Sequence, residues 1–181
     1  MEHQFGVFAL GAMTKMKFAA LFLMGILAWT GLSPARAETP NVPYSTNLKA
    51  DAELAKSRGV PIMVMFGAPH CPYCERLLSE FLLPMQRNPE YAKKVLMRRI
   101  EVGSTQSLID FNGKPTTQGD FAKLHRIGLS PTVVVFDYRG NPATAPLIGL
   151  GTVDYYGAFL DAAIDAGLTK IASNKSPQRL N

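Results

Sequence analysis

Cysteine is scarce in this chain of 181 residues, which contains two, Cys71 and Cys74. So few cysteines exclude a small scaffold held together by several disulfides. Residues 1–70 contain none, which also excludes a lipoprotein attachment site. Histidine is nearly as rare, with three residues, and a structural zinc site needs four ligands. Because only His70 lies beside the two cysteines, we expect no metal site and no bound cofactor.

A large excess of charge of either sign is also missing. Residues 38–181 carry 16 basic and 13 acidic side chains. The basic pairs at 93–94 and 98–99 stand alone, without the interleaved aromatic residues of a nucleic-acid surface. We therefore expect these pairs to be solvated and the protein to have no nucleic-acid partner.

The apolar run at residues 18–30 is shorter than the roughly 20 residues that a transmembrane helix needs. Lys15 and Lys17 precede it, and Ala35-Arg36-Ala37 follows with the small-x-small pattern of a cleavage site. This order predicts a signal peptide that is cleaved before Glu38. We therefore expect an exported, periplasmic protein with no stable membrane anchor, and an uncleaved anchor is the alternative.

The chain after the signal peptide has the length of one ordinary domain. Met13 or Met16 is a more natural initiator than Met1, because each lies close to the basic segment. The predicted organisation is a signal peptide at 1–37, an N-terminal extension at 38–46, a folded domain at 47–172 and a flexible tail at 173–181.

Cys71 and Cys74 are separated by Pro72 and Tyr73, which are expected to tune the pair. Two sulfurs this close in sequence can close a small ring as a disulfide and reopen as a dithiol, and so exchange electrons with other proteins. A structural disulfide is the alternative. So short a loop, however, removes little entropy from the unfolded chain, so the spacing favours a redox function.

Cys71 is expected at the start of a helix. A sulfur there faces unpaired backbone N–H groups and the positive end of the helix dipole, which favour the thiolate. Pro72 suits the first helical position, because the N–H that it lacks would be unpaired anyway. Cys71 is therefore the predicted nucleophile, and Cys74, one turn later and less exposed, is the predicted resolving thiol. His70 either stabilises the thiolate as an imidazolium or is an ordinary exposed loop residue.

Helices and strands alternate along the rest of the chain. Caps and helical periodicity predict helices at 47–58, from 72 onward, at 117–126 and from 152, the first ended by Gly59 and the last by Gly167. Apolar runs predict strands at 60–66, 95–102 and 132–136, and a shorter strand at 146–150. Pro84 is expected to kink the second helix, and residues 103–116 to form a long polar loop.

This order of elements resembles the thioredoxin superfamily. The resemblance rests on Phe66-Gly67-Ala68-Pro69-His70-Cys71-Pro72-Tyr73-Cys74, Gly128-Leu129-Ser130-Pro131-Thr132 and Gly149-Leu150-Gly151. It implies an α/β thioredoxin fold, a central mixed β-sheet flanked by helices, at 47–172. The polar insertion before Thr117 is similar to that of the exported SoxW-like branch. Periplasmic disulfide isomerases share the Cys-Pro-Tyr-Cys tetrad but add a dimerisation domain, for which residues 38–47 are too short, so a monomer is expected.

The resemblance also gives Pro131 a role. From the sequence alone an X–Pro bond is expected to be trans. In thioredoxin-like proteins, however, a cis-proline at this place lies against the active disulfide, and the backbone of its neighbour pairs with an extended substrate. Ser130 and Pro131 match this pattern and are therefore predicted to bind substrate. Tyr73, Leu129 and Leu150 are candidates for an apolar rim around the site, with ordinary packing as the alternative.

One position departs from the family pattern. Thioredoxins have a buried aspartate six residues before the first cysteine, and here that position is Met65. The usual base for the second cysteine is therefore missing. Glu75 and Glu101 are possible substitutes, and the sequence favours neither.

Three functions fit these residues. The first is a reductase that a membrane thiol–disulfide electron carrier keeps as the dithiol, and that reduces disulfides in exported proteins. The second is an oxidase or isomerase acting in oxidative folding, and the third is a non-catalytic binding module. We favour the reductase, although the reduction potential decides between the first two and no residue pattern fixes it.

Overall fold

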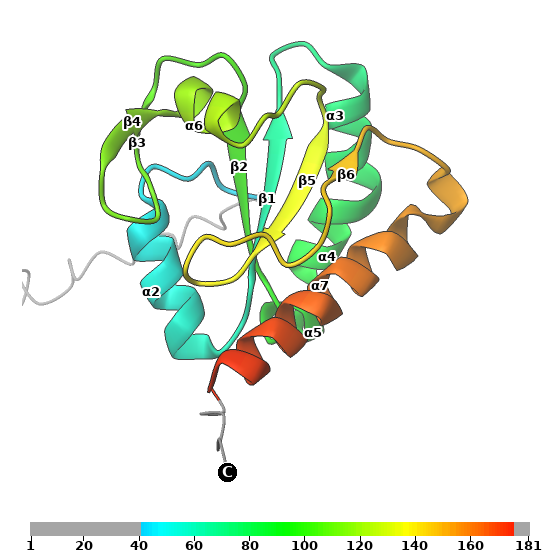
Figure 1. Ribbon diagram of the computed structural model, residues 1–181. Coiled ribbons are helices and arrows are strands. Elements are labelled where there is room, and N and C mark those ends of the chain that lie inside the picture. The colour runs from blue at the N-terminus through cyan, green and yellow to red at the C-terminus, as the bar shows by residue number, and fades with distance from the viewer. Residues whose placement is uncertain (1–40, 176–181) are drawn as a thin grey trace, which may run out of the picture. The chain divides into compact units, whose positions relative to one another are not determined.

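Four strands form a sheet through the centre of the protein (Figure 1). The computed structural model describes residues 41–175. The strands follow the order β2-β1-β5-β6; β1 is parallel to β2 and antiparallel to β5, and β6 is antiparallel to β5. Their bounds are β1 Ile62–Gly67, β2 Leu96–Glu101, β5 Thr132–Phe136 and β6 Leu147–Ile148. The predicted mixed sheet is confirmed. β5 has the predicted bounds, and the other three strands are shorter than predicted or shifted by one or two residues at their ends.

Helices cover both faces of the sheet, because the side chains of β1 alternate between two cores. Ile62, Val64 and Phe66 pack in one core with residues of two helices, α2 (Leu48–Arg58) and α6 (Gln118–Leu124). Met63 and Met65 belong to the other core, which is covered by α3 (Pro72–Leu77), η1 (Leu78–Leu82), α4 (Leu83–Arg87) and α7 (Val153–Lys175). Figure 1 shows α2 and α6 to the left of the sheet and the second group to the right; the short α5 (Pro89–Ala92) leads into β2.

Three of the predicted helix caps, Asn47, Gly59 and Thr117, are confirmed. The side chain of Asn47 accepts the backbone N–H of Ala50 at 2.9 Å, and Gly59 ends α2 in the left-handed conformation with φ 71°. Thr117 accepts the N–H of Asp120 at 3.0 Å at the start of α6. Each cap satisfies backbone groups that the helix itself leaves unpaired.

The helix that follows the cysteines changes its winding ahead of Pro84. α3 passes into η1, which is a π-helical turn, and then into α4, with Pro84 in its first turn. Proline has no N–H to donate to the preceding turn, and a π-helical turn is one way in which a helix accommodates such an interruption. The expected disturbance by Pro84 therefore takes the form of this turn.

The expectation of a polar loop at 103–116 is wrong, because a small hairpin forms there. Its strands are β3 (Ser107–Ile109) and β4 (Pro115–Thr117), which pair antiparallel. Leu108 is 1% exposed and anchors the hairpin in the core around Phe66. Asp110 shapes the turn by accepting the N–H of Lys114 at 2.8 Å. One buried side chain in a polar segment gives no periodicity that a sequence pattern can reveal.

The prediction that Gly167 ends the last helix is also wrong, because α7 continues to Lys175. A Cβ atom at residue 167 would lie 2.8 Å from Pro61 Cβ and 2.9 Å from Val135 Cγ1. These distances are too short for any side chain. Glycine is therefore present because α7 packs closely against the sheet at this point, and not because the helix stops.

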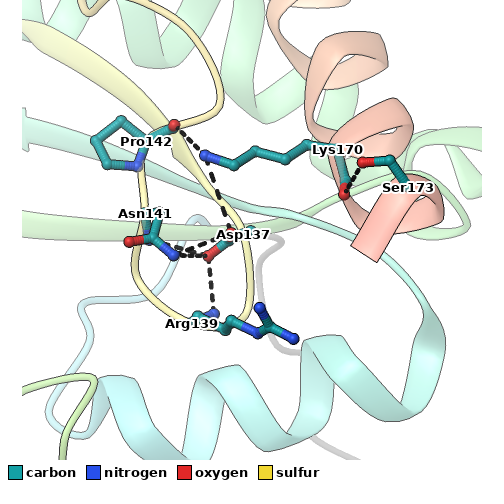
Figure 2. Close-up of polar contacts among 6 residues, drawn as sticks. All are labelled: Asp137, Arg139, Asn141, Pro142, Lys170 and Ser173. Atoms are coloured by element: carbon teal, nitrogen blue, oxygen red, sulfur yellow. Dashed lines mark hydrogen bonds and ion pairs between the residues drawn. The ribbon is translucent and has the colours of Figure 1, made fainter. Parts of the chain in front are cut away.

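Asp137, directly after β5, organises the turn toward β6 (Figure 2). The side chain of Asp137 is 1% exposed, and its Oδ1 accepts the backbone N–H groups of Arg139 and Asn141, both at 2.9 Å. Lys170 of α7 lies 3.9 Å from Oδ2 and donates to the carbonyl of Pro142 at 2.7 Å. The turn is thereby tied to α7.

Residues 42–45 lie along the outer edge of β2. The N–H of Ser45 donates to the Arg99 carbonyl at 2.9 Å, and the N–H of Arg99 donates to the Pro43 carbonyl at 2.8 Å. Val42 is fully buried. The predicted signal peptide at 1–37 and the residues after Lys175 lie outside the described part of the chain. Between residues 41 and 175, no helix has the length and apolar composition that crossing a membrane requires.

Candidate active site

A disulfide joins Cys71 and Cys74 just beyond the carboxyl end of β1, with 5.2 Å between their Cα atoms. Cys71 is partly exposed, whereas Cys74 is 3% exposed and packs in the core with Met65. An incoming thiol or disulfide can therefore reach the sulfur of Cys71 more easily than that of Cys74. This difference in access is what a nucleophilic and a resolving cysteine require.

Cys71 caps the helix that contains Cys74. Its backbone is extended, with φ −98° and ψ 104°, and Pro72 occupies the first turn of α3. The backbone N–H of Cys74 donates to Cys71 Sγ at 3.2 Å. A donor aimed at the sulfur stabilises negative charge on it, so the local geometry favours the thiolate of Cys71 once the disulfide is reduced.

His70 precedes the nucleophile in a left-handed conformation, with φ 54°. This backbone region is uncommon for residues other than glycine, although histidine is among the residues that tolerate it. The side chain of His70 is exposed, and among the described hydrogen bonds none links it to Cys71. The structure thus places His70 at the turn from β1 into α3 without assigning it an electrostatic role.

Ser130 and Pro131 lie at the same end of the sheet as the disulfide. β5 begins at Thr132, which pairs with Phe66 at the end of β1. The peptide bond between Ser130 and Pro131 is cis. The carbonyl of Pro131 accepts the N–H of Gly149 at 2.7 Å, so the segments that contain Ser130-Pro131 and Gly149-Leu150 are held side by side.

Large apolar side chains are exposed around this end of the sheet. Tyr73 is 61% exposed and Leu129 is 55% exposed. Leu150 is partly buried and packs against the core, so it contributes less open surface than the other two. Ile148, at 66%, was missed by the sequence interpretation. Its partner on β5 is Thr132, which follows the cis-proline, and this pairing is visible only once the strand register is known.

The surroundings of Cys74 are apolar. A Cβ at Gly67 would lie 3.7 Å from Cys74 Sγ and 3.5 Å from the terminal methyl of Met65. Glu75, next to Cys74 in sequence, is exposed on α3, whereas Glu101 is half-buried at the end of β2, opposite Gly67. Within residues 41–175, no group of three or more His, Cys, Asp or Glu side chains is arranged to hold a metal ion.

Comparison with known proteins gives a family match and several structural matches. The family described as Thioredoxin-like domain matches residues 48–164. No curated protein matches the chain. Thioredoxin O2 from Arabidopsis thaliana in the oxidised state is similar at 17% identity and a TM-score of 0.43, covering 68% of this chain and 94% of that one.

Two bacterial structures are similar to the same extent. Trxlp from Edwardsiella tarda has 21% identity and a TM-score of 0.45, covering 66% of this chain and 97% of its own. The periplasmic thioredoxin SoxS from Paracoccus pantotrophus, in the reduced form, has 18% identity and a TM-score of 0.41, covering 59% of this chain and 97% of its own.

Proposed function

The chain belongs to the thioredoxin-like domain family and carries the Cys71–Cys74 pair of a thiol–disulfide oxidoreductase, and we propose that it is an exported reductase of protein disulfides. The observation that carries this proposal is the capped, partly exposed sulfur of Cys71 beside the buried sulfur of Cys74. A purely structural disulfide has no need for this difference in access.

The reaction that this geometry supports has two exchange steps. The thiolate of Cys71 attacks a sulfur of the substrate disulfide, forms a mixed disulfide and releases one substrate thiolate. The thiol of Cys74 loses its proton and attacks Cys71 Sγ, which breaks the mixed disulfide and releases the second substrate thiolate. The substrate gains two electrons, and Cys71 and Cys74 are oxidised to the disulfide.

The apolar surface beside the disulfide suits an extended polypeptide as substrate. Tyr73, Leu129 and Ile148 offer exposed apolar contacts. Ser130 and Pro131, at the same end of the sheet, are proposed to supply the backbone contacts that hold the substrate next to Cys71. Exported proteins with oxidised cysteines are therefore the proposed substrates, in a monomeric enzyme.

The place of action and the electron source are part of the proposal. The segment from Lys15 to Ala37 has the order of a signal peptide, which supports the periplasm as the location. There the oxidised pair must regain two electrons and two protons after each turnover, and a membrane thiol–disulfide carrier is the proposed source. The polar insertion before Thr117 supports a place in the SoxW-like branch.

The reduction potential of the Cys71–Cys74 pair, measured in glutathione or dithiothreitol buffers, tests the direction of electron flow. A value of about −270 mV, with the dithiol trapped in cells by alkylation, is expected for a reductase. A value of about −120 mV with a trapped disulfide would show that the protein oxidises its substrates instead.

A trapping variant tests whether the protein is an enzyme at all. Cys74→Ser is expected to accumulate mixed disulfides with exported proteins, because the resolving thiol is gone. The matched control, Cys71→Ser with Cys74→Ser, should accumulate none. If neither variant traps a partner, the non-catalytic binding module becomes the better interpretation.

A further inference from the structure

A pocket of about 340 Å³ forms where α2, the hairpin of β3 and β4, and the turn after β5 meet. It lies on the side of the sheet that α2 covers, whereas Cys74 belongs to the core on the other side. The charged and aromatic side chains in its lining are Lys49, Glu53, Lys56, Phe111, Tyr138 and Arg139. The first three are four and three positions apart along α2, so they share one face of that helix.

The hairpin contacts both of the other segments that form the pocket. A Cβ at Gly113 in the hairpin turn would lie 3.1 Å from Lys49 Cδ, so the hairpin touches α2. A Cβ at Gly140 would lie 2.7 Å from the Phe111 ring, so the turn after β5 touches the hairpin. The buried carboxylate of Asp137 holds that turn in place (Figure 2). The pocket is therefore part of the folded domain and needs no ligand to assemble it.

Positive charge dominates the lining of this pocket. Lys49, Lys56 and Arg139 are exposed, and the lining contains one acid, Glu53. Lys56 Nζ and Arg139 Cζ each lie 5.9 Å from the centre of the Tyr138 ring, so two cations flank one aromatic ring. Within residues 41–175, no ion pair involves any of the three cations. They are therefore available to an anion, to which lysine and arginine form strong charge-assisted hydrogen bonds.

Phe111 and Tyr138 give the pocket an apolar wall. Both rings are half-buried and pack against the core around Phe66. The centre of the Phe111 ring lies 5.2 Å from that of Phe136, which fixes its position. A matching ligand buries a flat apolar surface against these rings and presents negative charge to the cations. The pocket is at the lower end of the size range of small-molecule sites, so it suits a small molecule better than a polypeptide.

We propose that this pocket binds a small organic anion in which a phosphate or carboxylate is attached to an aromatic ring or a similarly flat apolar group. Lys56 and Arg139 bind the anionic group, and the apolar part lies against Phe111 and Tyr138. Lys49 adds a third positive charge on the same face of α2, about 10 Å from Lys56 along the helix. The proposal does not depend on the proposed reductase function, because it uses none of the residues of the active site.

The pocket and the disulfide lie at opposite ends of β5. Pro131 directly precedes this strand and Asp137 directly follows it. A strand of this length spans about 17 Å. A ligand beside Tyr138 and Arg139 therefore does not touch Cys71. It stabilises the folded protein by mass action, and the rate of disulfide exchange should stay unchanged when the pocket is filled.

Isothermal titration calorimetry of the purified, oxidised protein tests the pocket with 1-naphthyl phosphate, 1-naphthoate and inorganic phosphate. We expect a naphthyl probe to bind about 10-fold more tightly than inorganic phosphate, because only the naphthyl ring contacts the aromatic wall. Lys56→Gln and Arg139→Gln should each weaken that binding by about 10-fold. Lys94→Gln, the matched control, removes an exposed lysine outside the pocket and should bind like the wild type. The tighter of the two naphthyl probes identifies the anionic group as phosphate or carboxylate.

Amide chemical shifts from NMR spectra of the wild type locate the bound probe, and the changes should be centred on Gly113 and Gly140. The proposal is overturned if neither naphthyl probe binds more tightly than inorganic phosphate, or if the two pocket variants keep the affinity of the wild type. It is also overturned if the changes are centred on Leu129 and Ile148, because the probe then binds the apolar surface beside the disulfide.

Discussion

The backbone N–H of Cys74 points at the sulfur of Cys71, with 3.2 Å between the nitrogen and Sγ. The Cys71 sulfur thus has two roles: it forms the disulfide with Cys74, and it caps α3, the helix that contains Cys74. Capping and redox chemistry can be separated by substitution, because a hydroxyl can do the first and not the second.

Cys71→Ser is expected to abolish disulfide reduction while leaving stability close to that of the reduced wild type. Serine is a good N-cap residue, and its oxygen can accept the same N–H. Cys71→Ala loses both functions and should be less stable than Cys71→Ser by about 1 kcal/mol. Urea unfolding under reducing conditions measures this difference. Equal stability of the two variants would mean that the cap contributes nothing.

Two glycines of α7 are expected to respond to alanine with opposite signs. At Gly167 a methyl group would lie 2.8 Å from Pro61 Cβ, so overpacking costs about 1–3 kcal/mol and exceeds the helix propensity that alanine gains. At Gly157 the nearest atom beyond the helix is in Phe81, 3.9 Å away, so Gly157→Ala should stabilise by about 0.5–1 kcal/mol. Thermal or urea unfolding of both variants checks the signs.

Tyr156→Phe should unfold no more easily than the wild type at neutral pH. The Tyr156 side chain is buried, and its hydroxyl has no hydrogen-bond partner among the described residues. The control is Tyr91→Phe, which removes a hydroxyl that donates to Asp161 at 2.8 Å and should cost about 0.5–1 kcal/mol. A larger loss of unfolding free energy in Tyr156→Phe than in Tyr91→Phe would mean that the Tyr156 hydroxyl does have a hydrogen-bond partner.

The same tyrosine predicts a loss of stability in alkaline solution. Burial raises the pKa of Tyr156 from its usual 10.0 to about 12. Between these values the unfolded chain has lost the phenol proton while the folded chain keeps it, so the free energy of unfolding falls as pH rises. Urea unfolding across this range should show a steeper fall for the wild type than for Tyr156→Phe. Parallel curves would mean that Tyr156 is not responsible.

His125 predicts a loss of stability in mild acid, as pH falls. Its ring packs against Phe121 and Phe136, with centroid distances of 4.4 and 5.1 Å, and burial lowers its pKa below 6.5. As pH falls through 6.5 the unfolded chain binds the proton first, so stability is lost until pH reaches the lower pKa of the folded state. His125→Phe should remove this part of the loss in urea unfolding between about pH 8 and pH 5. His70→Gln, at an exposed position, should retain it.

Local chemistry made much of the fold predictable. Asn47, Gly59 and Thr117 were recognised as caps because each needs only a few neighbouring residues to act. The strand at 132–136 was predictable for the same reason, because its run of apolar residues is visible in the sequence itself. The spacing of Cys71 and Cys74 likewise places both sulfurs in one helical turn without any knowledge of the rest of the chain.

Features set by packing between distant segments were not predictable. Gly167 has the signal of a helix end, and only the close approach of Pro61 and Val135 shows that glycine is needed there inside a continuing helix. Ile148 joins the apolar surface through its pairing with Thr132. Glu101 could be named as an acid near the site, but its position opposite Gly67 depends on the register of β1 and β2, in which each residue pairs with one 34 positions later, as Ile62 does with Leu96.

The segment at 42–45 also affects how the sheet meets other molecules. A strand edge with free N–H and C=O groups is a template for pairing with another chain, and a central sheet has two such edges. Here Pro43 and Ser45 occupy backbone groups of Arg99 on the β2 edge, while β6 on the other side has two residues and follows Pro146. Removing residues 41–46 would open the longer edge, so such a truncation is expected to make the domain prone to aggregate through β2.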